Sequence, residues 1–353
     1  MTTSDRLPGM QDVARLAGVS HQTVSRVLNF HPNVRPETKE RVLQAISTLG
    51  YRRNTAARAL VTRRSETIGL VTVNTALFGP TSTLLSVEAA ARRAGYFVSV
   101  ASLPAADAAH ITPTLEHFMA QAVEGVVVIA PQISVAKAAT VFGASVPVVL
   151  VAADVPQSPS YQSVSVDQYG GARMAVRHLI DLGHREIAHL AGPTEFYDGR
   201  ARVRGWRQEM KSAGLGVREP LIGDWSPGSG YQLGQQLIRQ GLPDAVFAAN
   251  DLMALGLLQA LSEVGIRVPQ DISIVGFDDI EGSAFFRPPL TTVRQDFSAL
   301  GGLCMDALTA AIAGEPTAGN AAIAPQLVVR ASTAPRSVGA TSTASRTSVG
   351  PSR

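Results

Sequence analysis

Residues 10–29 (MQDVARLAGVSHQTVSRVLN) constrain the fold more than any other segment, because they read as two short helices joined by a tight turn. The apolar residues of the first helix recur at helical spacing: Val13, Leu16 and Ala17. Gly18 ends this helix, since glycine adopts the left-handed C-cap conformation without steric cost. Ser20 is a favourable N-cap for the second helix. The second helix turns another apolar set inward: Val24, Val27 and Leu28.

The polar residues of the second helix are left on its outer side: His21, Gln22, Thr23, Ser25, Arg26 and Asn29. An exposed helix start of this composition can read base edges and contact phosphates. An ordinary helical hairpin with a solvated face would show the same apolar spacing. The agreement of spacing, cap and outward chemistry favours a nucleic-acid reader.

Charge is distributed unevenly along the chain. At 353 residues the chain is long enough for two or three domains, and its formal net charge is only +3. Residues 1–65 carry 11 Arg and Lys against 4 Asp and Glu, while the rest of the chain carries 20 against 24. A basic head on a mildly acidic body suits a head that meets a polyanion.

Cysteine content and apolar runs exclude several classes. Cys304 is the single cysteine, so an intrachain disulfide or a cysteine metal cluster is excluded, and we expect it to be a small buried apolar residue. The N-terminus lacks the apolar stretch of a secretory signal, and no apolar run reaches the roughly 18 residues of a membrane helix. We therefore expect a cytoplasmic protein without membrane contact, cofactor or metal.

The head extends beyond the helix pair. Residues 36–49 read as a third helix with Pro36 at its first position and Gly50 after its end. Its buried stripe is Val42, Ala45, Ile46 and Leu49. We expect the helix-turn-helix head to span residues 1–50 and a linker with a short helix to span 51–65. Such a short helix is only marginally stable by itself, because helix nucleation is costly.

From residue 66 onward, short apolar runs alternate with helical stretches. We expect strands at 68–73, 97–100, 125–130, 148–151, 187–190, 245–248 and 272–277. We expect helices that include 84–94, 172–182, 228–240 and 252–264. Repeated βα units predict an α/β fold with two doubly wound parallel-sheet subdomains and a cleft at the carboxyl ends of their strands. This core is expected over 66–335, with the chain crossing near 165 and 294, before a disordered tail at 336–353 rich in Ser, Thr, Ala, Gly and Pro.

Several ordered motifs resemble the lactose-repressor (LacI/GalR) family from Met10 to about Pro335. Besides the helix pair, they are Leu-Ala-Gly-Pro at 190–193, Arg-Val-Arg-Gly-Trp at 202–206, Gly-Asp-Trp-Ser at 223–226, Ala-Asn-Asp-Leu-Met-Ala-Leu-Gly at 249–256, Val-Gly-Phe-Asp-Asp at 275–279 and Pro-Pro-Leu-Thr-Thr-Val-Arg-Gln-Asp-Phe at 288–297. The resemblance implies a periplasmic-binding-protein-like body. It also implies a dimeric transcription regulator whose heads enter successive major grooves of a pseudo-palindromic operator.

Residue roles in the head are carried over from the family. The positions that match its base-reading residues are His21, Gln22 and Arg26. Those that match DNA-backbone contacts are Ser20, Thr23, Ser25, Asn29, Thr38 and Tyr51. In the linker, Asn54, Ala57 and Leu60 match residues placed in the minor groove, where Leu60 would wedge between base pairs. His21 stands where lactose-responsive members have a tyrosine, so the preferred bases are expected to differ.

The body has the residue types of a sugar site. A sugar needs planar hydrogen-bonding groups for its hydroxyls and a flat apolar surface for its C–H face. The positions that match effector contacts are Leu77, Pro80, Arg202, Trp225, Asn250, Asp278, Gln295 and Phe297. We expect Asp251 to cap the following helix, and Asp278 rather than Asp279 to face the cleft.

The first subdomain departs from the lactose-responsive pattern. Val73 stands where that pattern has a serine, and Ala152 and Ala153 stand where it has an aspartate. Asp154 could substitute only if its loop shifts. The expected effector is a small sugar-like molecule whose identity the sequence leaves open.

The expected mechanism is repression by a dimer that a small sugar-like inducer releases from DNA. Three alternatives stay open: a corepressor-dependent regulator, a sugar-binding solute receptor without gene regulation, and a sugar-acting α/β enzyme. The enzyme is disfavoured because the chain has no Gly-x-Ser-x-Gly, Walker A or Gly-x-Gly-x-x-Gly motif, and because His178, His184 and His189 lack metal spacing. A tetramer remains possible.

Overall fold

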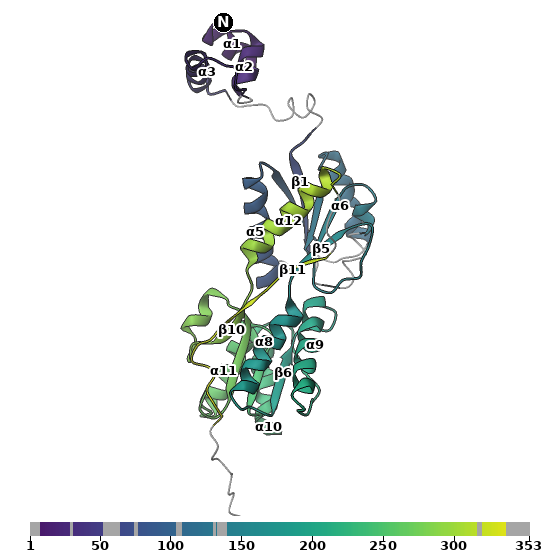
Figure 1. Cartoon of the computed structure of the whole chain (residues 1–353), viewed down its shortest axis with the longest axis vertical. Coiled ribbons are helices and arrows are strands. Elements are labelled where there is room, and N and C mark those ends of the chain that lie inside the picture. Colours follow the sequence, from purple (N-terminus) through teal and green to yellow (C-terminus); the bar gives the residue numbers. More distant parts are fainter. Residues whose placement is uncertain are drawn as a thin grey trace, which may run out of the picture. The chain divides into compact units, whose positions relative to one another are not determined.

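The computed structural model divides into two compact units, residues 1–65 and 66–353 (Figure 1). It describes residues 8–28, 31–51, 64–73, 77–103, 108–129, 132, 140–315 and 320–336. The expectations for Asn29, for Asn54, Ala57 and Leu60 of the linker, and for the tail beyond residue 336 lie outside these ranges. Within them, no helix is both long enough and apolar enough to span a bilayer.

The first unit contains three helices in its described residues: α1 (Met10–Ala17), α2 (His21–Leu28) and α3 (Pro36–Leu49). Gly18 and Gly50 end α1 and α3 with left-handed φ angles of 62° and 60°, as predicted. Their shared core consists of Val13, Ala14, Ala17, Val24, Val27, Val42 and Ala45. Ser20 caps α2, because its Oγ accepts a 3.2 Å hydrogen bond from the N–H of Thr23.

One expectation for this core is wrong. Leu16 is 53% exposed, and Ala14 is buried in its place. On a helix with 100° per residue, Leu16 lies 100° from Ala17 on one side and Ala14 lies 60° from Ala17 on the other. The buried stripe of α1 therefore consists of Val13, Ala14 and Ala17, which share one core with residues of α2 and α3.

The second unit begins with a lobe that we call lobe 1. Its sheet has the order β11-β5-β4-β3-β1-β2, with every neighbouring pair parallel. The strands are β1 (Thr67–Val73), β2 (Phe97–Leu103), β3 (Val126–Ile129), β4 (Val148–Val151), β5 (Gln162–Val166) and β11 (Ala321–Ile323). Helices α5 (Phe78–Arg93) and α12 (Phe297–Ile312) cover one face, and α6 (Ala108–Ala120) covers the other. Cys304 belongs to α12 and is buried in the cluster that joins α5 and α12 to the sheet, as expected.

Lobe 2 repeats this plan with the order β12-β10-β9-β8-β6-β7. Its strands are β6 (Ile187–Ala191), β7 (Leu221–Ile222), β8 (Ala245–Ala248), β9 (Ser273–Asp278), β10 (Thr291–Arg294) and β12 (Gln326–Val328). Helices α8 (Gln168–Asp181) and α9 (Tyr197–Ser212) cover one face, and α10 (Pro227–Gln240) and α11 (Asp251–Glu263) cover the other. A short 3-10 helix, η1 (Glu281–Phe285), follows β9.

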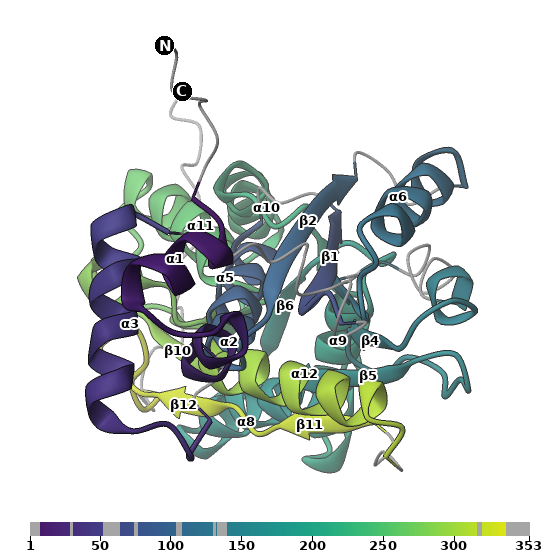
Figure 2. The same ribbon diagram turned by 90° about the horizontal axis from the view of Figure 1, so that it is seen from above.

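These two lobes confirm the predicted α/β class with two doubly wound sheets, and β12 is an antiparallel edge strand. The chain crosses between the lobes after β5 and after β10. A third crossing, which we did not predict, runs from β11 to β12, and Figure 2 shows these two strands in line. Parallel sheets bring the carboxyl ends of their strands to one edge, and the crossings bring the two edges together.

Candidate ligand pocket and nucleic-acid interface

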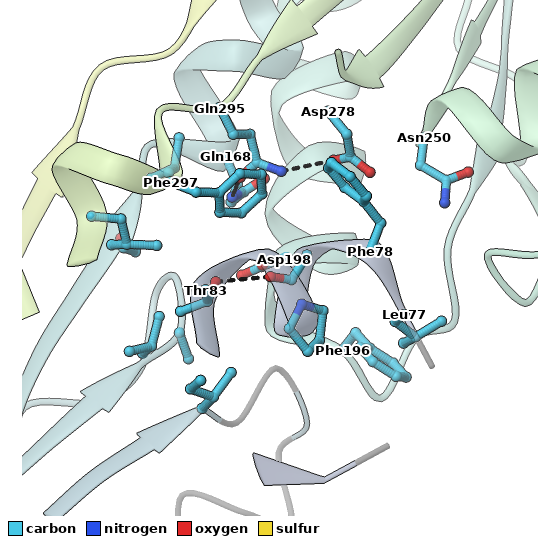
Figure 3. Close-up of a pocket in the computed structure, with 18 of the residues that line it drawn as sticks. Leu77, Phe78, Thr83, Gln168, Phe196, Asp198, Asn250, Asp278, Gln295 and Phe297 are labelled. Carbon is cyan, nitrogen blue, oxygen red and sulfur yellow. Dashed lines mark hydrogen bonds between the residues drawn. The ribbon is translucent and has the colours of Figure 1, made fainter. Parts of the chain in front are cut away.

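A cavity of about 760 Å³, which includes space open to solvent, lies between the two lobes. All eight residues expected to contact an effector line it: Leu77, Pro80, Arg202, Trp225, Asn250, Asp278, Gln295 and Phe297. Figure 3 labels five of these residues, Leu77, Asn250, Asp278, Gln295 and Phe297. It also labels five lining residues that the sequence analysis did not predict: Phe78, Thr83, Gln168, Phe196 and Asp198.

Four polar side chains form a ring of hydrogen bonds on the lobe 2 side. Arg202 Nε donates to Gln168 Oε1 at 2.9 Å, and Gln168 Nε2 donates to Gln295 Oε1 at 2.7 Å. Gln295 Nε2 donates to Asp278 Oδ1 at 2.7 Å, which is drawn as a dashed line in Figure 3. Arg202 closes the ring through its ion pair with Asp278 at 3.5 Å. Gln168 follows β5 and Gln295 follows β10, so the ring also joins two of the three crossings.

Arg202 is the centre of this ring and is 4% exposed. A guanidinium NH1 also donates to the carbonyl oxygen of Ala249, and the guanidinium carbon lies 3.8 Å from the Phe277 ring centre and 5.5 Å from that of Trp225. Burial lowers the pKa of Arg202, and the carboxylate of Asp278 opposes this shift. A guanidinium stays charged in proteins, so the pocket contains one fixed cation.

Asp278 and Asp279 have opposite positions, as expected. Asp278 lines the pocket, whereas Asp279 forms ion pairs with Arg294 at 2.6 Å and Arg330 at 2.7 Å. Burial raises the pKa of Asp278 to about 6, although Arg202 and the bond from Gln295 lower it. Asp278 has a φ angle of 108°, a conformation that costs a non-glycine residue roughly 1–3 kcal/mol and that clusters at functional sites.

The pair Asn250 and Asp251 corrects the expected cap. Asn250 caps α11, because its Oδ1 accepts from the N–H of Met253 at 2.8 Å, and its Nδ2 donates to the carbonyl oxygen of Trp225 at 3.0 Å. Asp251 is fully buried and does not cap the helix. Asn and Asp are both favourable N-cap residues, and the point at which β8 ends determines that Asn250 occupies the N-cap position of α11.

Asp251 instead fixes the segment after β9. Its Oδ2 accepts from Ser283 Oγ at 2.6 Å and from the N–H of Ile280 at 2.9 Å, and its Oδ1 accepts from Thr292 Oγ1 at 2.5 Å. Burial, followed by the charge of Asp278, raises the pKa of Asp251 to about 7. The contacts connect α11, η1 and β10 behind the pocket.

Trp225 forms an aromatic wall of the pocket and is 8% exposed. Its backbone is left-handed, with a φ angle of 73°, and its ring contacts Phe196 edge to face at 5.7 Å. A Cβ at Gly192 would lie 2.1 Å from the indole, so only glycine leaves room for this ring. The indole Nε1 is buried without a hydrogen-bond partner in the described part of the chain.

The lobe 1 side of the pocket is mostly apolar. It includes Leu77, Pro80, Ile129, Val151 and Phe297, and its polar side chains are Thr83 and Ser165. Phe297 contacts Phe78 edge to face at 5.8 Å. Asp154, which could have replaced the missing aspartate, is paired with Arg204 and does not line this cavity.

The histidines named above fit structural roles. His178 and His184 form hydrogen bonds with Thr333 Oγ1 and the Ala334 carbonyl oxygen, and His189 Nδ1 is 2.9 Å from the Phe247 carbonyl oxygen. Burial lowers the pKa of His189 to about 3, so this side chain is neutral. The described residues contain no group of three or more metal-binding side chains.

In the head, the outer side of α2 is polar and accessible. His21, Gln22 and Arg26 are exposed, and Thr23 and Ser25 are half-buried. Ser20 is exposed at the helix start, and Thr38 is half-buried near the start of α3. Tyr51 packs against the head core. The structure therefore places the three expected base-reading side chains on one accessible helix.

Comparisons with known proteins agree with the description of both the head and the two-lobed body. The family described as bacterial regulatory proteins, lacI family, matches residues 9–54, and a periplasmic binding protein-like domain matches 176–333. The lactose operon repressor of Escherichia coli (strain K12) is 36% identical over 330 residues, covering 92% of this chain and 90% of that repressor. The regulator CelR of Thermobifida fusca is 37% identical over 324 residues, covering 88% and 94%.

Solved structures show the same fold. A lac repressor dimer bound to operator and the anti-inducer ONPF matches with a TM-score of 0.82 at 34% identity, covering 93% of this chain and 100% of that chain. A complex of the transcriptional regulator CelR with cellobiose matches with a TM-score of 0.68 at 33% identity, covering 92% and 99%.

A helix-turn-helix head followed by a two-lobed body with a cavity between the lobes defines a ligand-responsive, DNA-binding transcription regulator. The chain belongs to the lacI family of bacterial regulatory proteins. This confirms the family resemblance, the fold class and the regulatory function predicted from the sequence. The relatives named above are repressors and regulators rather than enzymes.

Proposed function

We propose that this protein represses transcription as a dimer on a pseudo-palindromic operator, and that a small sugar-like inducer bound between the lobes releases it. The observation that carries the proposal is the ring of Arg202, Gln168, Gln295 and Asp278, which faces the cavity and joins two crossings. A ligand that contacts this ring contacts the segments about which the lobes move.

The head supplies the chemistry for DNA. His21, Gln22 and Arg26 are exposed on α2 and are proposed to read bases in the major groove. Backbone contacts are proposed for Ser20, Thr23, Ser25, Asn29, Thr38 and Tyr51, and minor-groove contacts for Asn54, Ala57 and Leu60. The 11 basic residues among the first 65 would add the phosphate attraction that dominates non-specific affinity. We propose that the protein acts on the chromosome in the cytoplasm.

The pocket supplies the chemistry for a saccharide. Arg202 and Asp278 offer charge-assisted hydrogen bonds to hydroxyls, and Trp225 and Phe297 offer flat apolar walls to C–H faces. Binding of a saccharide is supported by the relative CelR, whose solved complex contains cellobiose. We propose that this protein binds its effector without chemical turnover, in keeping with the relatives that are repressors.

Coupling requires different effector affinities in two arrangements of the body. A ligand with equal affinity for both would shift no equilibrium. We propose that effector binding changes the positions of the lobes and hence the spacing of the two heads in the dimer. An inducer would bind tighter to the released form, and a corepressor would bind tighter to the DNA-bound form.

The test is operator binding by fluorescence anisotropy on the full chain, with a duplex selected from a random library. Cellobiose and the methyl glycosides of glucose, galactose and xylose are then titrated into the complex. Weaker DNA binding on saccharide addition supports induction, and tighter binding overturns it in favour of a corepressor. If no saccharide changes the affinity, the sensing role is wrong.

The reading role of α2 has its own variants. Gln22→Ala and Arg26→Ala should each lower the preference for one operator base by about 1–3 kcal/mol. Gln44→Ala, which alters an exposed glutamine on α3, is the matched control and should leave discrimination unchanged. Full discrimination in both α2 variants would refute the assignment of the recognition helix.

A further inference from the structure

Asp198 occupies the place of a missing acid. The sequence has Ala152 and Ala153 where lactose-responsive relatives have an aspartate at the end of β4 in lobe 1. Asp198 belongs to lobe 2, in the first turn of α9. Its Oδ1 accepts a hydrogen bond from the N–H of Ala153 at 3.2 Å. A carboxylate therefore lies against the backbone at the position from which the lobe 1 acid is absent, but it comes from the opposite lobe.

We propose that Asp198 is a specificity-determining residue of the pocket, and that it makes the effector a neutral polyhydroxylated molecule while excluding anionic sugars. This inference rests on the proposed function and names the ligand class of the same site. It concerns which saccharides are accepted rather than whether DNA binding responds to them.

The charges of the pocket support this selection. Three ionisable side chains line the cavity in the described chain: Asp198, Arg202 and Asp278. With both carboxylates ionised, the net charge of the three side chains is −1. Burial raises the pKa of Asp198 and of Asp278, and the charge of Arg202 lowers the pKa of both. Phosphate or carboxylate on a ligand would enter an electronegative, poorly solvated site, and like charges in such a site repel strongly.

Hydrogen-bonding capacity points the same way. The side-chain amides of Gln168, Gln295 and Asn250 are engaged with other protein groups at both their oxygen and nitrogen ends. Carboxylates can accept several bonds each, and ionised ones are acceptors only. Asp198 and Asp278 therefore favour ligands that donate hydrogen bonds, as hydroxyls do, whereas phosphates and carboxylates offer only acceptors at neutral pH.

The location of Asp198 beside the apolar wall of lobe 1 makes its charge important for ligand selection. Lobe 1 contributes Thr83 and Ser165 as its polar side chains in the lining, and its remaining lining is apolar. Asp198 lies one helical turn before Arg202 on α9, so both project from the same face of that helix. It is thus the charged group that borders the apolar wall, where a ligand hydroxyl has few other partners.

The test measures binding to the full chain by isothermal titration calorimetry. The probes are the methyl glycosides of glucose, galactose, mannose and xylose, cellobiose, and two anionic counterparts of the hexoses, the 6-phosphates and the uronic acids. We expect the tightest probe to be neutral and its anionic counterparts to bind at least tenfold more weakly. A tightest probe that is anionic overturns the inference and leaves the proposed function intact.

Asp198→Asn keeps the size and the oxygen that accepts from Ala153 but removes the charge. We expect this substitution to weaken the binding of the tightest neutral probe at least tenfold. We also expect a smaller ratio between the affinity for neutral probes and the affinity for anionic probes. Asp154→Asn is the matched control, because Asp154 is a nearby carboxylate outside the pocket lining. Unchanged binding and an unchanged ratio in Asp198→Asn, or a change confined to Asp154→Asn, would overturn the role of Asp198.

Two outcomes separate the levels of the claim. If saccharides release the Asp198→Asn variant from DNA and its selectivity for neutral over anionic saccharides is unaltered, this inference fails and the proposed induction stands. If no saccharide of either charge binds the unmodified protein, the proposed function itself fails, and this inference fails with it. Operator binding by both variants verifies that the head and body are folded.

Discussion

Lobe 1 and lobe 2 share one plan of six strands between two layers of helices, yet they contribute opposite chemistry to the pocket. All buried charged side chains in the described residues belong to lobe 2, namely Arg202, Glu209, Asp251 and Asp278. The buried polar side chains of lobe 1 are Thr72, Thr83 and Ser163. The difference teaches that the repeated architecture sets where the pocket lies, and that the lobe 2 side chains set what it recognises.

This division has a physical cost in lobe 2. A buried carboxylate is tolerated only when hydrogen bonds compensate for its lost hydration. Asp251 has three such bonds and Asp278 has bonds from Gln295 and Arg202. Lobe 2 is therefore expected to depend on its polar network, whereas lobe 1 is expected to depend on apolar packing.

The largest effect should follow from Asp251→Ala. This change leaves Ser283 Oγ, Thr292 Oγ1 and the N–H of Ile280 without their acceptor, and each unsatisfied buried group costs about 1–3 kcal/mol. We expect the free energy of unfolding of lobe 2 to fall by about 3–5 kcal/mol. Urea denaturation followed by circular dichroism measures this loss.

The control for this loss is Asp271→Ala. Asp271 forms an ion pair with Arg267 at 2.7 Å on the surface of lobe 2, and solvent screening leaves such exposed pairs with little effect on stability. A comparable loss in both variants would show that lobe 2 does not depend on its buried network, and the contrast between the lobes would fail.

The sequence predicts the parts of this contrast that depend on local pattern. Helices α1 to α3 and continuously apolar strands such as β4 and β8 are found where expected, because their periodicity and caps are local signals. Strands β5 and β10 were missed, since QSVSV and TTVR carry too many polar residues to read as buried parallel strands. Their neighbours in the sheet, rather than their own sequence, explain their burial.

The pocket divides in the same way. Arg202, Asn250 and Asp278 follow recognisable motifs at the ends of strands or on helices, so the family resemblance identifies them. Gln168 and Asp198 escaped notice because their importance arises when the crossings and the two lobes approach each other. Asn250 and Asp251 are adjacent residues with the same capping preference, so only the geometry of the strand end distinguishes them.

A medium effect is expected from pH on effector binding. The raised pKa of Asp278, about 6, means that its acceptor charge is present above pH 6 and lost as pH falls through this value. Affinity for a neutral saccharide should be level above about pH 7 and should fall up to tenfold for each unit below pH 6, which corresponds to about 1.4 kcal/mol. Titration calorimetry between pH 5 and 8 measures this dependence.

The neighbours of Asp278 specify the control for this pH effect. Arg202, Asp198 and Asp251 interact with Asp278 electrostatically, and no histidine lines the cavity in the described residues. Asp278→Asn should bind more weakly at pH 8 and should show a shallower decline toward pH 5. If the affinity of Asp278→Asn declines as steeply as that of the unmodified protein, another carboxylate is responsible for the pH dependence. Asp278 would then not be one of the lobe 2 residues that recognise the effector.

The smallest effect should come from lobe 1, with the opposite sign. Thr72 lies in β1, is fully buried, and its hydroxyl has no hydrogen-bond partner within the described ranges. Valine has nearly the same shape without the hydroxyl, so Thr72→Val removes the penalty of burying an unsatisfied polar group. We expect the free energy of unfolding to rise by about 1 kcal/mol, measured by the same urea denaturation, with effector affinity unchanged. A loss of stability would show that the hydroxyl of Thr72 makes a stabilising polar contact in lobe 1. The proposed contrast, in which lobe 1 depends on apolar packing and lobe 2 on its polar network, would then be weakened.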